Sequence, residues 1–172
     1  NAINAKGNMG ITYHHFIGVN QSTGEELIKY ARNCLVDLNY SVDHPWVKKF
    51  SLQLLIQEAE DDFQRKLYKK SMNKYETILN EQQKFHEFSE VMTGLNRKYY
   101  QAMYAYAVEL TTLTGDYQQA KQYIEICLIE SIKYFQSTER FSYQISLLTI
   151  ELYRLCNEIS FAIEQYELLL KN

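Results

Sequence analysis

The chain has 172 residues and a formal net charge of −3, with acidic and basic residues interleaved, so no basic stripe is available for a phosphate backbone and direct nucleic-acid binding is disfavoured. One proline, six glycines and long stretches of Leu, Ile, Ala, Glu, Gln, Lys and Tyr without alternation indicate an almost entirely helical protein. No apolar run of about 18 residues is present, so no membrane span is expected. Three separated cysteines within apolar helical patterns favour a reducing, cytoplasmic location.

The first half of the chain predicts two pairs of helices. The first pair covers about residues 4–16 and 24–38, and a connection then leads to Pro45, which suits the first turn of a helix. The second pair covers about residues 46–64 and 66–85. Hardly any turn signal separates these last two helices, so one long bent helix is an alternative.

The second half predicts two further pairs with clearer boundaries. In the third pair, Gly115 can adopt the left-handed conformation that ends a helix and Asp116 can cap the next one. Asn157 marks the turn of the fourth pair. The four helices are predicted over about 96–114, 117–135, 140–156 and 160–170.

One pattern recurs in the second helix of these pairs: a small residue, an aromatic or aliphatic residue four positions later, and an apolar pair at positions seven and eight. Its three occurrences are Ser71/Tyr75/Ile78-Leu79, Ala120/Ile124/Cys127-Leu128 and Ala162/Tyr166/Leu169-Leu170. The residues twelve positions earlier, in the first helices, are Ala59, Val108 and Ile150. Because a self-similar helical period indicates stacked repeats, we expect an all-α superhelical solenoid of about four antiparallel helix pairs, forming a single domain over residues 1–172.

The best-defined repeat resembles a tetratricopeptide repeat. The resemblance rests on the small residues of Ala102–Leu128, on the turn Gly115-Asp116 and on Ala120. The chain lacks the closing proline of that family, and its repeats are 49 and 42 residues apart, longer than the family's minimal unit. These departures are similar to the degenerate repeats of the Rap, PlcR and Rgg-like group of peptide-responsive regulators in Gram-positive bacteria.

The resemblance implies a peptide-binding domain that serves as the ligand-sensing part of a bacterial transcriptional or signalling regulator, as in quorum sensing. A peptide or protein segment would bind the concave face, and a DNA-binding or effector domain would lie elsewhere. We read the chain as a fragment of a longer protein in which Asn1-Ala2 is a tag remnant. The alternative function is a constitutive protein-protein scaffold or oligomerisation module, with a homodimer as one outcome.

The concave face is predicted from the residues one position after the packing stripe of each first helix. This construction places a glutamate at the same point of three successive repeats, in the stripes Ile56/Glu60/Phe63, Ala105/Glu109/Thr112 and Leu147/Glu151/Arg154. The three carboxylates would form an acidic ridge for the amino, Lys or Arg groups of a peptide. Glutamate is also a good helix former, so chance is the alternative explanation, and Arg154 either holds a peptide carboxylate or pairs with Glu151.

His14 and His15, near the end of the first predicted helix, fall on the inner side, and His14 together with Asn4 is a further candidate for ligand contact. Adjacent His14 and His15 diverge by about 100° around a helix, so they are not expected to share a metal ion. The sequence shows no phosphate-binding glycine loop, nucleophile elbow or zinc motif. We therefore expect no catalytic residue, no metal and no cofactor.

Overall fold

The computed structural model describes residues 45–81 and 92–171. This part of the chain contains six α-helices and no strand: α3 (Pro45–Gln64), α4 (Tyr68–Asn80), α6 (Leu95–Glu109), α7 (Tyr117–Glu130), α8 (Arg140–Leu155) and α9 (Ile159–Lys171). A π-helical segment, Leu110–Thr114, prolongs α6, and a 3-10 turn, Ser131–Lys133, prolongs α7. The all-helical prediction is confirmed for these residues, whereas the first predicted pair, 4–16 and 24–38, lies outside them.

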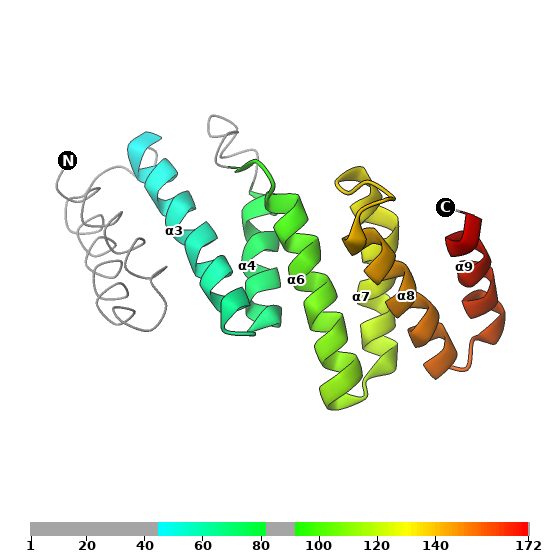
Figure 1. Ribbon diagram of the computed structural model, residues 1–172. Coiled ribbons are helices and arrows are strands. Elements are labelled where there is room, and N and C mark those ends of the chain that lie inside the picture. The colour runs from blue at the N-terminus through cyan, green and yellow to red at the C-terminus, as the bar shows by residue number, and fades with distance from the viewer. Residues whose placement is uncertain (1–44, 82–91, 172) are drawn as a thin grey trace.

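The helices follow one another in space in the order of the chain. Each packs against its predecessor and its successor, from α3 on α4 through to α8 on α9, and Figure 1 shows them as a row. No helix in the described ranges is long and apolar enough to cross a membrane. We use the word pair for α3/α4, α6/α7 and α8/α9, whose members are joined by short turns.

The turns within the three pairs share one backbone conformation. Each contains a residue with positive φ: Lys66 (62°), Gly115 (68°) and Asn157 (61°). Each of these residues stands five positions before a buried small residue of the following helix, namely Ser71, Ala120 and Ala162. The turn at Lys66 ends α3 at Gln64, so the second pair consists of two helices and the alternative of one long bent helix is wrong.

The packing register of the first helices differs from the sequence alignment by one residue in two pairs. In α3, Ala59 is fully buried, and its carbonyl oxygen accepts a hydrogen bond from the Ser71 hydroxyl at 2.7 Å. The fully buried residues at this place in α6 and α8 are Ala107 and Thr149, whereas the aligned Val108 and Ile150 are half-buried. The sequence does not show which residue of each adjacent pair is buried, because both residues are small or apolar. A shift of one residue nevertheless rotates the buried face of a helix by about 100°.

Candidate functional site

Of the residues predicted from α3, Glu60 contacts the first turn of α6 and Phe63 contacts the start of α4. The Glu60 carboxylate is half-buried and forms a salt bridge with the Lys98 ammonium group of α6. The Phe63 ring packs edge-to-face against Tyr68, with ring centroids 5.4 Å apart. Glu60 therefore links two helices of the chain, and Phe63 supports the turn into α4.

The residues predicted from α6 lie at its C-terminal end. Glu109 is half-buried at the last position of α6, and Thr112 is exposed in the π-helical segment. The Thr112 hydroxyl donates a hydrogen bond to the Val108 carbonyl oxygen at 2.8 Å. This back-bond to its own helix occupies the hydroxyl proton that a ligand would otherwise accept.

The residues predicted from α8 form a surface ion pair. Arg154 donates to both carboxylate oxygens of Glu151, from Nε at 2.8 Å and from Nη2 at 2.6 Å. The hydrogen bonds from Arg154 hold the pKa of the Glu151 carboxyl below its usual value. Of the two roles considered for Arg154, pairing with Glu151 is the one that the structure contains.

The three glutamates do not occupy equivalent positions in the observed register. The residues equivalent to Glu60 are Val108 in α6 and Ile150 in α8, one position before Glu109 and Glu151. The reason is the one-residue shift of the buried stripe described above. The acidic ridge stays a prediction as a ligand site, and Asn4 and His14 lie outside the described residues.

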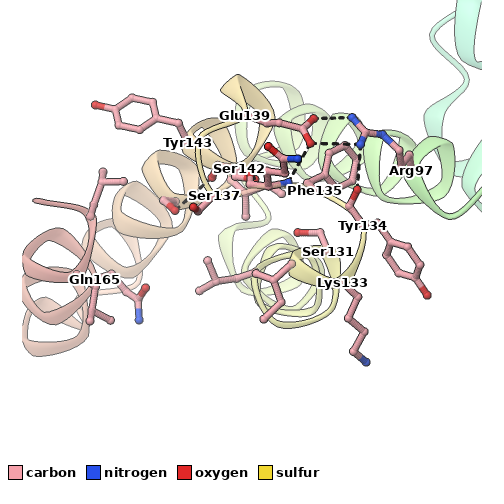
Figure 2. A pocket seen from close by; sticks show the side chains of 17 residues that line it. Arg97, Ser131, Lys133, Tyr134, Phe135, Ser137, Glu139, Ser142, Tyr143 and Gln165 are labelled. Carbon is pink, nitrogen blue, oxygen red and sulfur yellow. Dashed lines mark hydrogen bonds and ion pairs between the residues drawn. The ribbon is translucent and has the colours of Figure 1, made fainter. Parts of the chain in front are cut away.

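The structure instead shows a groove where the C-terminal end of α7, the first two turns of α8 and the C-terminal half of α9 meet (Figure 2). Its volume is about 880 Å³. Gln165 of α9 lies on one side of it, and Ser131 and Lys133 lie on the other. The apolar lining comes mainly from Leu128, Ile132, Phe135, Tyr143, Ile145, Leu168 and Leu169, and the polar lining includes Ser131, Ser137, Ser142, Ser146 and Gln165.

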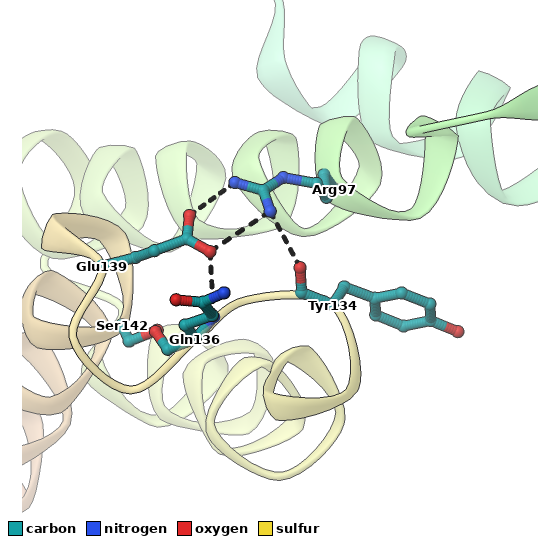
Figure 3. A network of polar contacts seen from close by, with 5 residues as sticks. All are labelled: Arg97, Tyr134, Gln136, Glu139 and Ser142. Carbon is teal, nitrogen blue, oxygen red and sulfur yellow. Dashed lines mark hydrogen bonds and ion pairs between the residues drawn. The ribbon is translucent and has the colours of Figure 1, made fainter.

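A network of polar contacts holds one wall of the groove, the segment between α7 and α8 (Figure 3). Arg97 of α6 donates to the two carboxylate oxygens of Glu139, at 3.2 and 2.5 Å, and to the Tyr134 carbonyl oxygen at 3.0 Å. The Gln136 backbone N–H donates to Glu139 at 2.9 Å. The Arg97 guanidinium also lies over the Phe135 ring, 4.3 Å from its centroid. The wall is thus anchored to α6, a helix that comes well before it in the chain.

Charged side chains at the groove are paired with one another. Hydrogen bonds from Arg97 and from the Gln136 backbone lower the pKa of Glu139, which therefore stays ionised opposite Arg97 at neutral pH. Lys133 donates to the Glu130 carboxylate at 2.5 Å. The rest of the lining is neutral, and the described residues contain no group of side chains suited to a metal ion. The groove therefore suits an apolar or aromatic group with neutral polar neighbours better than a phosphate or a metal.

Sequence reasoning missed this site because its lining comes from three helices and a connecting segment. The only local signal was the pair of small residues Ser142 and Ser146, one turn apart on α8. No protein-family model matches the chain, and no curated protein or solved structure matches it either. The resemblance to tetratricopeptide repeats and to peptide-responsive regulators thus remains an expectation from the sequence.

Proposed function

We propose that this chain is a peptide-binding domain built as a tetratricopeptide-like superhelical solenoid. The observation that carries the binding function is the groove between α7, α8 and α9, which is large enough for several side chains of a peptide and is mainly apolar. The Gln165 amide supplies donors and an acceptor for a peptide backbone, and the Ser142 and Ser146 hydroxyls, whose protons are donated to backbone carbonyl oxygens, supply acceptors.

Three observations support the solenoid architecture. The helices pack in chain order, the three intra-pair turns share a positive-φ residue at the same register, and a small residue is buried at the same place in each second helix. A structure in which each unit contacts only its neighbours is typical of repeat proteins. Such a fold responds to a ligand by a change of curvature, which suits the ligand-sensing part of a cytoplasmic bacterial transcriptional or signalling regulator.

A second candidate function, a scaffold or oligomerisation module, is favoured by the outer face of α9. Ile159, Ile163, Tyr166 and Leu170 form a stripe on this helix and are 49%, 55%, 52% and 70% exposed. The equivalent positions of α4 and α7, each of which has a helix packed after it, are buried or half-buried: Tyr68, Met72, Tyr75, Leu79, Tyr117, Lys121, Ile124 and Leu128. An exposed apolar stripe of this kind is suited to a partner helix.

The peptide function is tested with a random peptide display library selected on the immobilised chain. Two exposed isoleucines of α7 and its extension form a matched pair, because Ile132 lines the groove and is 71% exposed, whereas Ile129 does not line it and is 62% exposed. We expect selected peptides to bind the native chain and Ile129→Glu alike, and to lose roughly tenfold or more in affinity with Ile132→Glu, which corresponds to about 1.4 kcal/mol.

The same experiment distinguishes the peptide-binding function from the scaffold function. If no selected peptide depends on Ile132, the peptide-binding proposal is wrong. Sedimentation equilibrium over a range of chain concentrations then tests the scaffold: an average mass that rises with concentration, and falls back to the monomer mass with Ile163→Glu, would favour oligomerisation through α9.

A further inference from the structure

The groove is lined by a residue of α8 whose counterpart in α6, one pair earlier, is a tyrosine. When α6 and α8 are aligned on their buried residues, Met103 corresponds to Ile145 and Ala107 to Thr149. In this register, Tyr100 of α6 corresponds to Ser142 of α8. The pair α8/α9 therefore has a hydroxymethyl group where α6/α7 has a phenol.

In α6/α7, Tyr100 fills the space between the first half of α6 and the end of α7. It is only 8% exposed, and its ring stacks on that of Tyr134, with centroids 5.7 Å apart and planes inclined by 27°. The Cys127 thiol of α7 lies 3.8 Å from the Tyr100 carbonyl oxygen. Burial, followed by the nearby Tyr134 and Glu130, raises the pKa of Tyr100, as expected for a phenol inside the packing of two helices.

In α8/α9, the corresponding space is open. Ser142 donates its hydroxyl to the Gln136 carbonyl oxygen at 2.8 Å and so lies against the segment before α8. Leu169 of α9 corresponds to Cys127 of α7, and both Ser142 and Leu169 line the groove. The pair α8/α9 thus has an open groove beside Ser142, whereas the buried Tyr100 ring stands at the corresponding place in α6/α7.

We propose that this groove binds an aromatic side chain, Tyr or Phe, of a short peptide, in the place that Tyr100 occupies in the preceding pair. The inference rests on the proposed peptide-binding function and names its anchor residue. Leu128, Ile132 and Leu169 supply an apolar wall for the ring. An aromatic ring is a favourable anchor because it buries a large apolar area while few rotatable bonds are fixed.

The lining also argues against other anchors. A Lys or Arg anchor would need an unpaired acidic partner, but Glu139 is already bound by Arg97 and Glu130 by Lys133. An acidic anchor would meet the same two pairs, whose cations are satisfied. The neutral, largely apolar space favours a neutral ring.

Two substitutions show whether a loss of ligand binding comes from a ring inside the groove or from an added aromatic ring anywhere on the surface. Ser142→Tyr introduces the residue found in α6 and should occupy the proposed place of the aromatic anchor, whereas Ser160→Tyr adds the same side chain at an exposed position on α9 that does not line the groove. The probes are N-acetyl-tyrosinamide and N-acetyl-leucinamide, titrated into isotope-labelled chain and followed by NMR. Thermal melts of both variants verify that they fold.

We expect N-acetyl-tyrosinamide to shift the methyl resonances of Leu128, Ile132 and Leu169 at concentrations at least fivefold lower than N-acetyl-leucinamide does. Ser142→Tyr should abolish these shifts, and Ser160→Tyr should leave them unchanged. Equal shifts by both probes, or tyrosinamide shifts that persist in folded Ser142→Tyr, would overturn the inference.

The display library gives a second readout that uses only the native chain and the Ile132→Glu variant. Peptides that need Ile132 should carry Tyr or Phe at one constant position. If such peptides are recovered with no aromatic residue in common, the aromatic anchor is wrong while the peptide-binding function stands. If no peptide needs Ile132, the peptide-binding function itself fails.

Discussion

Lys66 holds a backbone conformation that lysine rarely adopts. Its φ of 62° places it in the left-handed region, where a residue with a Cβ atom is strained, while the equivalent turns use Gly115 and Asn157. The conformation is retained because the turn makes two backbone hydrogen bonds, from Lys66 N–H to the Phe63 carbonyl oxygen at 3.0 Å and from Leu67 N–H to that of Asp62 at 2.8 Å. These bonds satisfy the last carbonyl groups of α3.

Lys66→Gly should therefore stabilise the chain. We expect the free energy of unfolding to rise by about 0.5–1 kcal/mol, because relief of the left-handed strain outweighs the added flexibility of glycine in the unfolded chain. Urea denaturation measures the change. Lys70→Gly, at an exposed position inside α4, is the control and should lower the free energy of unfolding by about 0.5–1 kcal/mol. Equal destabilisation by both changes would show that the Lys66 conformation is not strained.

The acidic ridge is harder to predict than the helices because it depends on which of two adjacent residues is buried. Glu60, Glu109 and Glu151 recur at the same spacings as the repeats, but their alignment depends on which of two small or apolar neighbours is buried in each first helix. Sequence contains no information on that choice when both neighbours are compatible with the core. The ion pair of Glu60 with Lys98 joins two helices that only the folded chain brings together, whereas the pair of Glu151 with Arg154 lies within one helix and was one of the roles considered from the sequence.

At the scale of elements, the boundary between α6 and α7 combines a π-helical segment with a capped helix start. The Asp116 side chain accepts a hydrogen bond from the Gln119 backbone N–H at 3.1 Å, and the Asp116 N–H donates to the Leu110 carbonyl oxygen at 3.2 Å. The Gly115-Asp116 signal predicted this boundary correctly. The Lys66 turn carries no comparable signal, because lysine is neither a usual left-handed residue nor a helix cap.

Asp116→Ala should lower the free energy of unfolding by about 1 kcal/mol, since it removes the side-chain acceptor that caps α7. Asp116→Asn retains an acceptor and should cost much less. Chemical denaturation of the two variants beside the native chain gives the comparison. A loss of equal size for alanine and asparagine would assign the effect to the charge of Asp116 and not to the cap.

Across the molecule, a buried thiol and several half-buried phenols resist deprotonation. Burial raises the pKa of Cys127 to about 12, and burial together with nearby acidic groups raises the pKa of Tyr99 and of Tyr153 to about 12. The folded state thus keeps protons that the unfolded chain releases at lower pH. By linkage, the free energy of unfolding falls as the pH rises over any range in which the unfolded state binds fewer protons than the folded state.

The chain should accordingly lose stability in alkali. The contribution of Cys127 declines between pH 9 and about 12, and that of Tyr99 between pH 10 and about 12. Urea midpoints measured between pH 8 and pH 11 should fall, and Tyr99→Phe should show a shallower fall because it removes one titrating group. A pH-independent midpoint, or the same slope in Tyr99→Phe, would show that these groups titrate alike in both states.

Much of the fold is predictable from sequence alone. Helical propensity, the scarcity of proline and glycine, and the recurring small residues Ser71, Ala120 and Ala162 predict the helices, most of their ends and the side on which each second helix is buried. These features are local, since each depends on residues within a few turns of one helix.

The groove and the exact register depended on tertiary structure. Leu128, Ser142 and Leu169 belong to three different helices, and they define one space only because α8 packs against both α7 and α9. Whether Ser142 leaves a gap depends on the distance of α8 from α7 and α9, which is set by the packing of the core as a whole and not by the serine. A helix period specifies the direction of each side chain, but the distance to the next helix is decided by all the residues between them.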